Sequence, residues 1–103
     1  MNKKVKRPWG YYNLLVKQNE YLIKKIVISA KQSISLQKHN HRSEHWIVLS
    51  GKAHIVIGTK KIILKESQSI FVPAKRRHKI TNKSSESLII LETQLGKILS
   101  EKD

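Results

Sequence analysis

The sequence contains no cysteine, no apolar run long enough to cross a membrane, and few acidic residues. The absence of cysteine excludes disulfide bonds, thiolate zinc sites and cysteine nucleophiles, and it fits a reducing cytoplasm. A bilayer-spanning helix needs roughly 20 apolar residues, and no signal-peptide pattern follows the basic N-terminus. We therefore expect a cytoplasmic protein without a membrane partner, folded as one domain over residues 1–103.

The shortage of acidic residues makes the chain strongly basic. Only 7 Asp and Glu stand against 21 Lys and Arg, so the formal net charge is +14. Such a surface attracts polyanions or phosphorylated small molecules. The basic residues are mostly lysines scattered along the chain, and no RNP-like aromatic motif or helix-turn-helix pattern accompanies them. Nucleic acid is therefore not the expected partner.

Apolar residues alternate with a period of two along almost the whole chain. This period is typical of strands, and turn signals at Ser50–Gly51, Gly58–Thr59 and Asn82–Lys83 separate them. The sequence therefore predicts an all-β barrel or sandwich. Its predicted strands are 21–28, 34–36, 46–50, 53–57, 62–64, 70–72 and 88–91. Outside them we expect an N-terminal arm over about 1–12, docked through Trp9, and at most a helical turn within 95–103.

A polar cluster interrupts the predicted strands between Gln37 and Trp46. Side chains at i and i+2 point to one face of a strand, so we expect Gln37, His39 and His41 to aim together and Glu44 to share a face with Trp46. Histidine, carboxylate and amide groups converging inside a barrel suit a divalent metal such as zinc, iron or manganese. The alternative is a polar edge strand with solvated histidines. His78, at the start of a later strand, makes that alternative weaker.

The first polar stretch resembles the first motif of the cupin superfamily, in which two ligands two residues apart precede a glutamate and then a glycine. A pair at His39 and His41 leaves only two residues before Glu44, which is too short. A pair at Gln37 and His39 leaves four, with six more from Glu44 to Gly51, which fits the motif.

The second polar stretch resembles the second cupin motif at Pro73, His78 and Asn82, with Lys75 in place of the usual glycine. The resemblance implies a single cupin barrel, a jelly-roll or double-stranded β-helix, that holds one divalent metal ion per chain. Zinc is the expected ion, and manganese, cobalt, iron and nickel are alternatives. The metal ligands that the resemblance implies are Gln37, His39, Glu44 and His78.

A closer resemblance runs from about Lys6 to Gly96. The segments 7–12, 36–48 and 66–69 are similar to the type II mannose-6-phosphate isomerase domain, commonly the C-terminal part of bifunctional mannose-1-phosphate guanylyltransferase/isomerase proteins of GDP-mannose biosynthesis. The chain has no glycine-rich nucleotidyltransferase loop. Family members continue beyond the element matched at Gln94 and Gly96, whereas this sequence ends at Asp103, so we expect part of the active site to be absent.

The resemblance implies a metal-dependent isomerase that interconverts mannose 6-phosphate and fructose 6-phosphate. That reaction needs a Lewis acid, a base active near neutral pH and cations for the phosphate. His41 is the candidate base, or else a histidine at the rim. Arg42, Lys38 and Arg76 are the candidate phosphate-binding residues, Arg42 first because a guanidinium forks onto phosphate oxygens.

Two other functions stay open at this point. One is a non-catalytic, metal-containing cupin module that binds a sugar or sugar nucleotide, and the other is an oxidoreductase that uses iron and oxygen. We also predict a homodimer, because the apolar strand 88–91 and the N-terminal arm have the character of segments that pair across a two-fold axis. His45 is expected to have a structural or subunit-contact role, and His54 is expected at the surface.

Overall fold

The computed structural model describes residues 3–97 and 99, with the side chains of 35–38 outside the description. The described residues form ten strands and no helix, which confirms the all-β prediction. No helix in this part of the chain has the length and apolar character needed to cross a membrane. The strands are β1 (Lys4–Arg7), β2 (Gly10–Lys17), β3 (Tyr21–Ile28), β4 (Ser33–Lys38), β5 (Ser43–Ser50), β6 (Ala53–Ile57), β7 (Lys60–Leu64), β8 (Ser69–Val72), β9 (Arg77–Thr81) and β10 (Leu88–Leu95).

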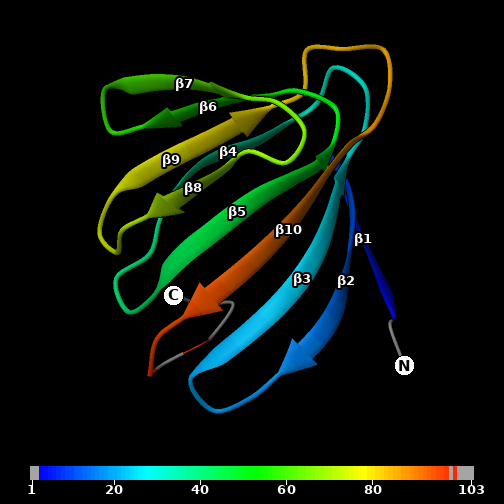
Figure 1. Ribbon diagram of the computed structural model, residues 1–103. Coiled ribbons are helices and arrows are strands. Elements are labelled where there is room, and N and C mark those ends of the chain that lie inside the picture. The colour runs from blue at the N-terminus through cyan, green and yellow to red at the C-terminus, as the bar shows by residue number, and fades with distance from the viewer. Residues whose placement is uncertain (1–2, 98, 100–103) are drawn as a thin grey trace.

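The strands build two antiparallel sheets that face each other (Figure 1). The larger sheet has the order β1-β2-β3-β10-β5-β8, and the smaller has the order β4-β9-β6-β7. Ile28, Val48 and Leu88 from the large sheet pack against Ala53 and Ile55 from the small one, and all five are almost completely buried. The core thus fills the space between the sheets, as the alternation of apolar residues requires.

The N-terminal segment forms a strand pair at the edge of the large sheet. β1 pairs with β2 and β2 pairs with β3, so residues 4–17 extend the sheet by two strands that the sequence analysis did not predict. Trp9, between the two, packs against the core. Gly10 lies at φ +148°, and a Cβ there would collide with the carbonyl oxygen of Val27, so this close approach of β2 to β3 requires glycine.

Strand β10 occupies the interior of the large sheet. It pairs with β3 on one side and β5 on the other along most of its length. Its backbone hydrogen-bonding groups are therefore used within the sheet. The prediction that residues 88–91 pair with a second copy across a dimer axis is wrong, because β3 and β5 already occupy both sides of this strand. β1 is an edge strand and keeps one side for such pairing. The homodimer itself stays a prediction.

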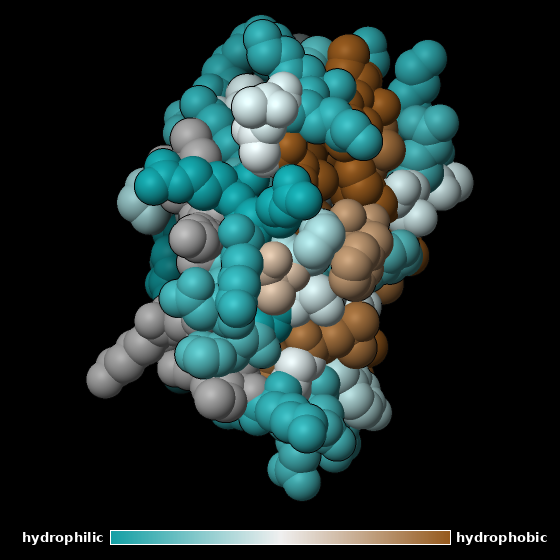
Figure 2. Space-filling model, turned by 90° about the vertical axis from the view of Figure 1, so that its left-hand side faces the viewer, coloured by the Kyte–Doolittle hydropathy of each residue, from teal (hydrophilic) through white to brown (hydrophobic). Residues whose placement is uncertain are grey.

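One face of the molecule shows a band of apolar residues bordered by hydrophilic ones (Figure 2). The large apolar side chains exposed on the described part of the chain include Leu49, Ile63 and Phe71.

The helical turn predicted within residues 95–103 falls largely outside the described residues. β10 runs to Leu95, a bend follows at residues 96–97, and residues 98 and 100–103 are not described.

Asn82 connects the end of β9 to the large sheet. Its Nδ2 donates to the carbonyl oxygens of Ile28 at 3.0 Å and Glu86 at 2.7 Å, and its Oδ1 accepts from the backbone N–H of Ser84 at 3.0 Å. The side chain is fully buried. The asparagine of the second cupin motif therefore has a structural role here, because it satisfies backbone groups where the chain leaves the small sheet.

The inward face of the large sheet changes character along its strands. Leu88 and Ile90 on β10 belong to the core, whereas Glu92 and Gln94 on the same face are buried polar residues. Glu92 lies opposite Lys24 of β3, which is also buried. The polar half is the end where β10 finishes and β3 and β5 begin, in the lower part of Figure 1. The candidate functional site lies in this half.

Candidate metal centre

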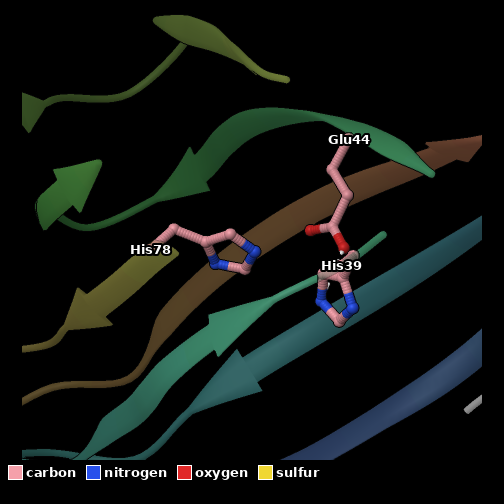
Figure 3. Close-up of side chains that lie close together, drawn as sticks. All are labelled: His39, Glu44 and His78. Atoms are coloured by element: carbon pink, nitrogen blue, oxygen red, sulfur yellow. Dashed lines mark ion pairs between the residues drawn. The ribbon is translucent and has the colours of Figure 1, made fainter. Parts of the chain in front are cut away.

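Three of the four predicted metal ligands come together between the two sheets. His39 follows β4, Glu44 is on β5 and His78 is on β9, so both sheets contribute (Figure 3). Each residue offers one ligand atom, and these atoms all lie within 4.8 Å of one another. All three side chains are buried. Two imidazole nitrogens and a carboxylate oxygen at such separations form a donor set suited to zinc and other divalent transition metals.

The alternation of β5 places Glu44 inward. Glu44, Trp46 and Val48 are buried on one face, while His45 between them is half-buried on the other. The Trp46 indole Nε1 donates to Glu44 Oε1 at 2.8 Å, and Arg42 Nε donates to Glu44 Oε2 at 3.0 Å. Each carboxylate oxygen of Glu44 therefore accepts a hydrogen bond, one from Trp46 and one from Arg42. These bonds fix the orientation of the carboxylate toward the histidines.

Arg42 also reaches His39. Its guanidinium nitrogen Nη2 lies 3.0 Å from His39 Nε2, and Glu44 Oε2 lies 3.3 Å from the same ring nitrogen. Arginine can only donate hydrogen bonds, so His39 Nε2 is the acceptor in its contact with Arg42. Arg42 is buried, as are both of its partners. The arrangement places a permanent positive charge beside the two candidate ligands.

His78 has an unpartnered nitrogen directed into the site. Its Nε2 is buried and has no hydrogen-bond partner among the described residues. Its ring stacks edge-on against Trp46 at 5.1 Å between centroids and lies 5.2 Å from the His39 ring. Burial lowers the pKa of His78, against the opposing effect of the Glu44 carboxylate. A neutral imidazole whose buried Nε2 has no hydrogen-bond partner fits a metal ligand, since an unpartnered buried nitrogen is otherwise costly.

The remaining predicted site residues have different positions. Gln37 is the cross-strand neighbour of His78 in the register of β4 and β9, but its side chain and that of Lys38 lie outside the described residues. His41 is exposed on the loop between β4 and β5. Arg76 is exposed and lines a separate cavity of about 420 Å³ beside β7 and β8. The roles proposed for these four residues stay predictions.

The candidate metal centre lies beside several cavities, and the two larger ones are lined by cationic side chains. A space of about 20 Å³, enough for one water-sized species, is lined by Glu44, His78 and Glu92. Two larger cavities, of about 410 Å³ and about 120 Å³, are both lined by Tyr12, Lys24, Arg42 and Gln94. Lys24 Nζ lies 4.2 Å above the centre of the Tyr12 ring, a cation–π contact.

Glu92 is a cavity residue that the sequence analysis missed. It is buried, and Gln94 Nε2 donates to its Oε1 at 2.5 Å. Burial, helped by the nearby Glu44 carboxylate, raises the pKa of Glu92 to about 8, so the group is neutral at pH 7. Its signal in the sequence is the alternation of Leu88, Ile90, Glu92 and Gln94, which continues an apolar face with polar residues.

Comparison with known proteins identifies the relatives of this chain. Residues 1–103 match the family described as "Mannose-6-phosphate isomerase C-terminal". The xanthan biosynthesis protein XanB of Xanthomonas campestris is 37% identical over 102 residues, which are 99% of this chain and 22% of that protein. The mannose-1-phosphate guanylyltransferase RfbM of Salmonella typhimurium is 36% identical over 102 residues, 99% of this chain and 21% of that protein. The chain spans about a fifth of the length of these relatives.

These relatives contradict the prediction that the chain functions as a mannose-6-phosphate isomerase. RfbM is a guanylyltransferase by name, and the part that corresponds to this chain is a small fraction of it. The segments 7–12, 36–48 and 66–69, which suggested an isomerase, belong to a fold that supports several chemistries. The isomerase prediction is therefore wrong, whereas the kinship with enzymes of mannose phosphate metabolism holds.

The fold has relatives among solved structures. An RmlC-like cupin from Shewanella frigidimarina superimposes with a TM-score of 0.85 over 98% of this chain and 87% of that one, at 20% identity. This likeness confirms the predicted cupin architecture. Together with the match over all 103 residues, it shows that the chain is a cupin domain of the mannose-6-phosphate isomerase C-terminal family.

Proposed function

We propose that this chain is a metal-containing cupin domain that binds a sugar phosphate. The observation that carries the proposal is the convergence of His39, Glu44 and His78 within 4.8 Å, beside cavities lined by Lys24 and Arg42. A metal held by these residues, with Gln37 as a fourth ligand, would act as a Lewis acid toward a sugar oxygen. Zinc is the metal we propose, because the donor set is two nitrogens and an oxygen.

Two features favour a phosphorylated sugar over a neutral one. The cavity is lined by cations from several strands, Lys17 on β2, Lys24 on β3 and Arg42 before β5, and the net charge of the chain is +14. Cations in a concave site attract phosphate more strongly than the same charges on a flat surface. A relative that acts on mannose 1-phosphate by name is consistent with a ligand of this class.

Glu92 and Gln94 on β10 line the cavity with uncharged hydrogen-bonding groups. Because the Glu92 carboxyl is neutral at pH 7, it can donate a hydrogen bond as well as accept one, as can the Gln94 amide. Such groups suit sugar hydroxyls, which also donate and accept. We therefore propose that the hydroxyl-bearing ring lies against β10 and the phosphate toward Lys24 and Arg42.

The test combines metal analysis with calorimetry. Purified protein is expected to hold about one divalent ion per chain by elemental analysis, and to bind mannose 6-phosphate or mannose 1-phosphate at least tenfold more tightly than mannose. A double variant with His39→Ala and His78→Ala is expected to lose the metal. His54→Ala is the matched control, because His54 lines a cavity on the outer side of β6 with Lys61 and Lys79.

Two outcomes would contradict the proposal. Unchanged metal content in the double variant would show that the ion is bound elsewhere. Equal affinity for mannose and its phosphates would show that the cations do not select the ligand.

The predicted homodimer is tested on the same purified protein by light scattering. A monomer at micromolar concentration would reject the homodimer.

A further inference from the structure

The guanidinium of Arg42 contacts two of the three residues that would bind the metal. Arg42 Nη2 lies 3.0 Å from His39 Nε2, and Arg42 Nε donates to Glu44 Oε2 at 3.0 Å. These two acceptors are themselves 3.3 Å apart. One side chain thus bridges two candidate ligands through adjacent nitrogens, in a buried setting where charge-assisted hydrogen bonds are strong.

The contact with His39 is incompatible with metal coordination through the same nitrogen. A neutral imidazole has one lone pair on its unprotonated nitrogen, and that lone pair either accepts a hydrogen bond or binds a metal. Carboxylate oxygens have more than one lone pair, so Glu44 alone imposes no such choice. A divalent ion and a guanidinium also repel each other at this separation. The geometry therefore makes the two cations competitors for His39.

The surroundings show where a displaced Arg42 would find room. Besides contacting the two ligands, Arg42 lines both large cavities, together with Tyr12, Lys24 and Gln94. The larger cavity measures about 410 Å³, so a guanidinium that leaves His39 moves into space already open to it. There the guanidinium joins Lys17 and Lys24, in a place where an anionic group of the ligand would pair with these cations.

We propose that Arg42 and the divalent metal are alternative partners of His39, so that metal binding transfers the guanidinium to the cavity and completes the binding site for the phosphate group. Before the metal binds, Arg42 holds His39 and Glu44 in place, and afterwards it is a ligand-binding residue in the cavity. The inference rests on the proposed function, because it assumes a metal at the histidines and a phosphate in the cavity. It adds that the two binding events are coupled.

The coupling has a quantitative signature. If metal raises the affinity for phosphate by some factor, phosphate must raise the affinity for metal by the same factor. Replacing Arg42 by a neutral residue removes a competitor that makes charge-assisted hydrogen bonds to His39 and Glu44. We therefore expect the metal affinity of Arg42→Gln to rise by about ten- to a hundredfold in the absence of phosphate.

The experiment is a cobalt titration of the full chain after chelation and dialysis. Bound Co²⁺ is followed by its visible absorption, which does not depend on enzymatic activity. Wild type, Arg42→Gln and Arg42→Lys are titrated with and without inorganic phosphate and mannose 6-phosphate. Arg77→Gln is the matched control, because Arg77 is exposed on β9 beside the buried His78. In wild type we expect either phosphate ligand to tighten Co²⁺ binding several-fold.

The outcomes separate this inference from the proposed function. Tighter Co²⁺ binding and loss of the phosphate effect in Arg42→Gln, with neither change in Arg77→Gln, support the exchange. Weaker or unchanged Co²⁺ binding in Arg42→Gln overturns it while the metal site stands. A phosphate effect that persists undiminished in Arg42→Gln also overturns it, because direct contact between metal and phosphate then explains the coupling. Absence of Co²⁺ binding by wild type overturns the proposed function and the inference with it.

Discussion

The neutral carboxyl of Glu92 predicts an unusual dependence of stability on pH. Burial raises its pKa in the folded chain from 4.5 to about 8. Below the pKa that Glu92 has in the unfolded chain, the folded and the unfolded chain both hold the proton. Between the two values the unfolded chain releases its proton and the folded chain does not, so the free energy of unfolding falls as pH rises and the loss is complete above about 8. Since each pKa unit corresponds to about 1.4 kcal/mol, the loss amounts to a few kcal/mol.

The perturbation that isolates this effect is Glu92→Gln. The amide has nearly the shape of the neutral carboxyl and still accepts from Gln94, but it does not ionise. The difference in unfolding free energy between variant and wild type is therefore expected to grow in favour of the variant by a few kcal/mol from pH 5 to pH 9. For a chain of this size that corresponds to roughly 10 °C or more in Tm.

The assay is thermal unfolding by circular dichroism between pH 5 and pH 9, in the presence of a chelator. The chelator matters because a divalent ion at Glu44 would change the electrostatic field at Glu92. Glu66→Gln is the control, since Glu66 is an exposed carboxylate in the turn before β8. A difference between Glu92→Gln and wild type that stays flat from pH 5 to pH 9 would refute the reasoning.

Three further substitutions test other parts of the structure. Trp46→Phe removes the indole donor to Glu44 Oε1 and is expected to weaken metal binding about tenfold, measured by competition with a chromophoric chelator. Asn82→Ala leaves buried backbone groups unpaired, so urea unfolding is expected to show a loss of about 2–4 kcal/mol. Gly96→Ala places a Cβ against the carbonyl oxygen of His41 and the Cα of Arg42; we expect a lower Tm and weaker sugar phosphate binding, because the loop that carries Arg42 must shift.

The strands were predictable from the sequence where apolar residues alternate with polar ones. β3, β5 and β6 follow this pattern, and the spacing from Gln37 to Gly51 and from Pro73 to Asn82 indicates the cupin motifs from the sequence alone. β1 and β2 were missed. β1 consists largely of basic residues and β2 contains the continuous apolar run 14–16, so neither shows a clear period of two.

The candidate site was predictable only as far as the motifs reach. They indicated His39, Glu44 and His78, which the fold brings together. Lys24 and Glu92 lie on strands far apart in the sequence, and their pairing arises from the register between β3 and β10. Arg42 was assigned to phosphate alone, because its hydrogen bonds to His39 and Glu44 depend on how the loop between β4 and β5 packs. Such cross-strand and loop contacts are set by tertiary structure.

The change from apolar to polar residues along one face of β10 has a consequence for how the domain tolerates variation. Leu88 and Ile90 maintain the core, while Glu92 and Gln94 line cavities on the same side of the same strand. A saturation scan of β10 would therefore show sensitive positions at every second residue throughout, but with a change of phenotype midway, from lost abundance to altered ligand preference. The half that lines the cavities is consequently free to diverge without rebuilding the half that keeps the chain folded.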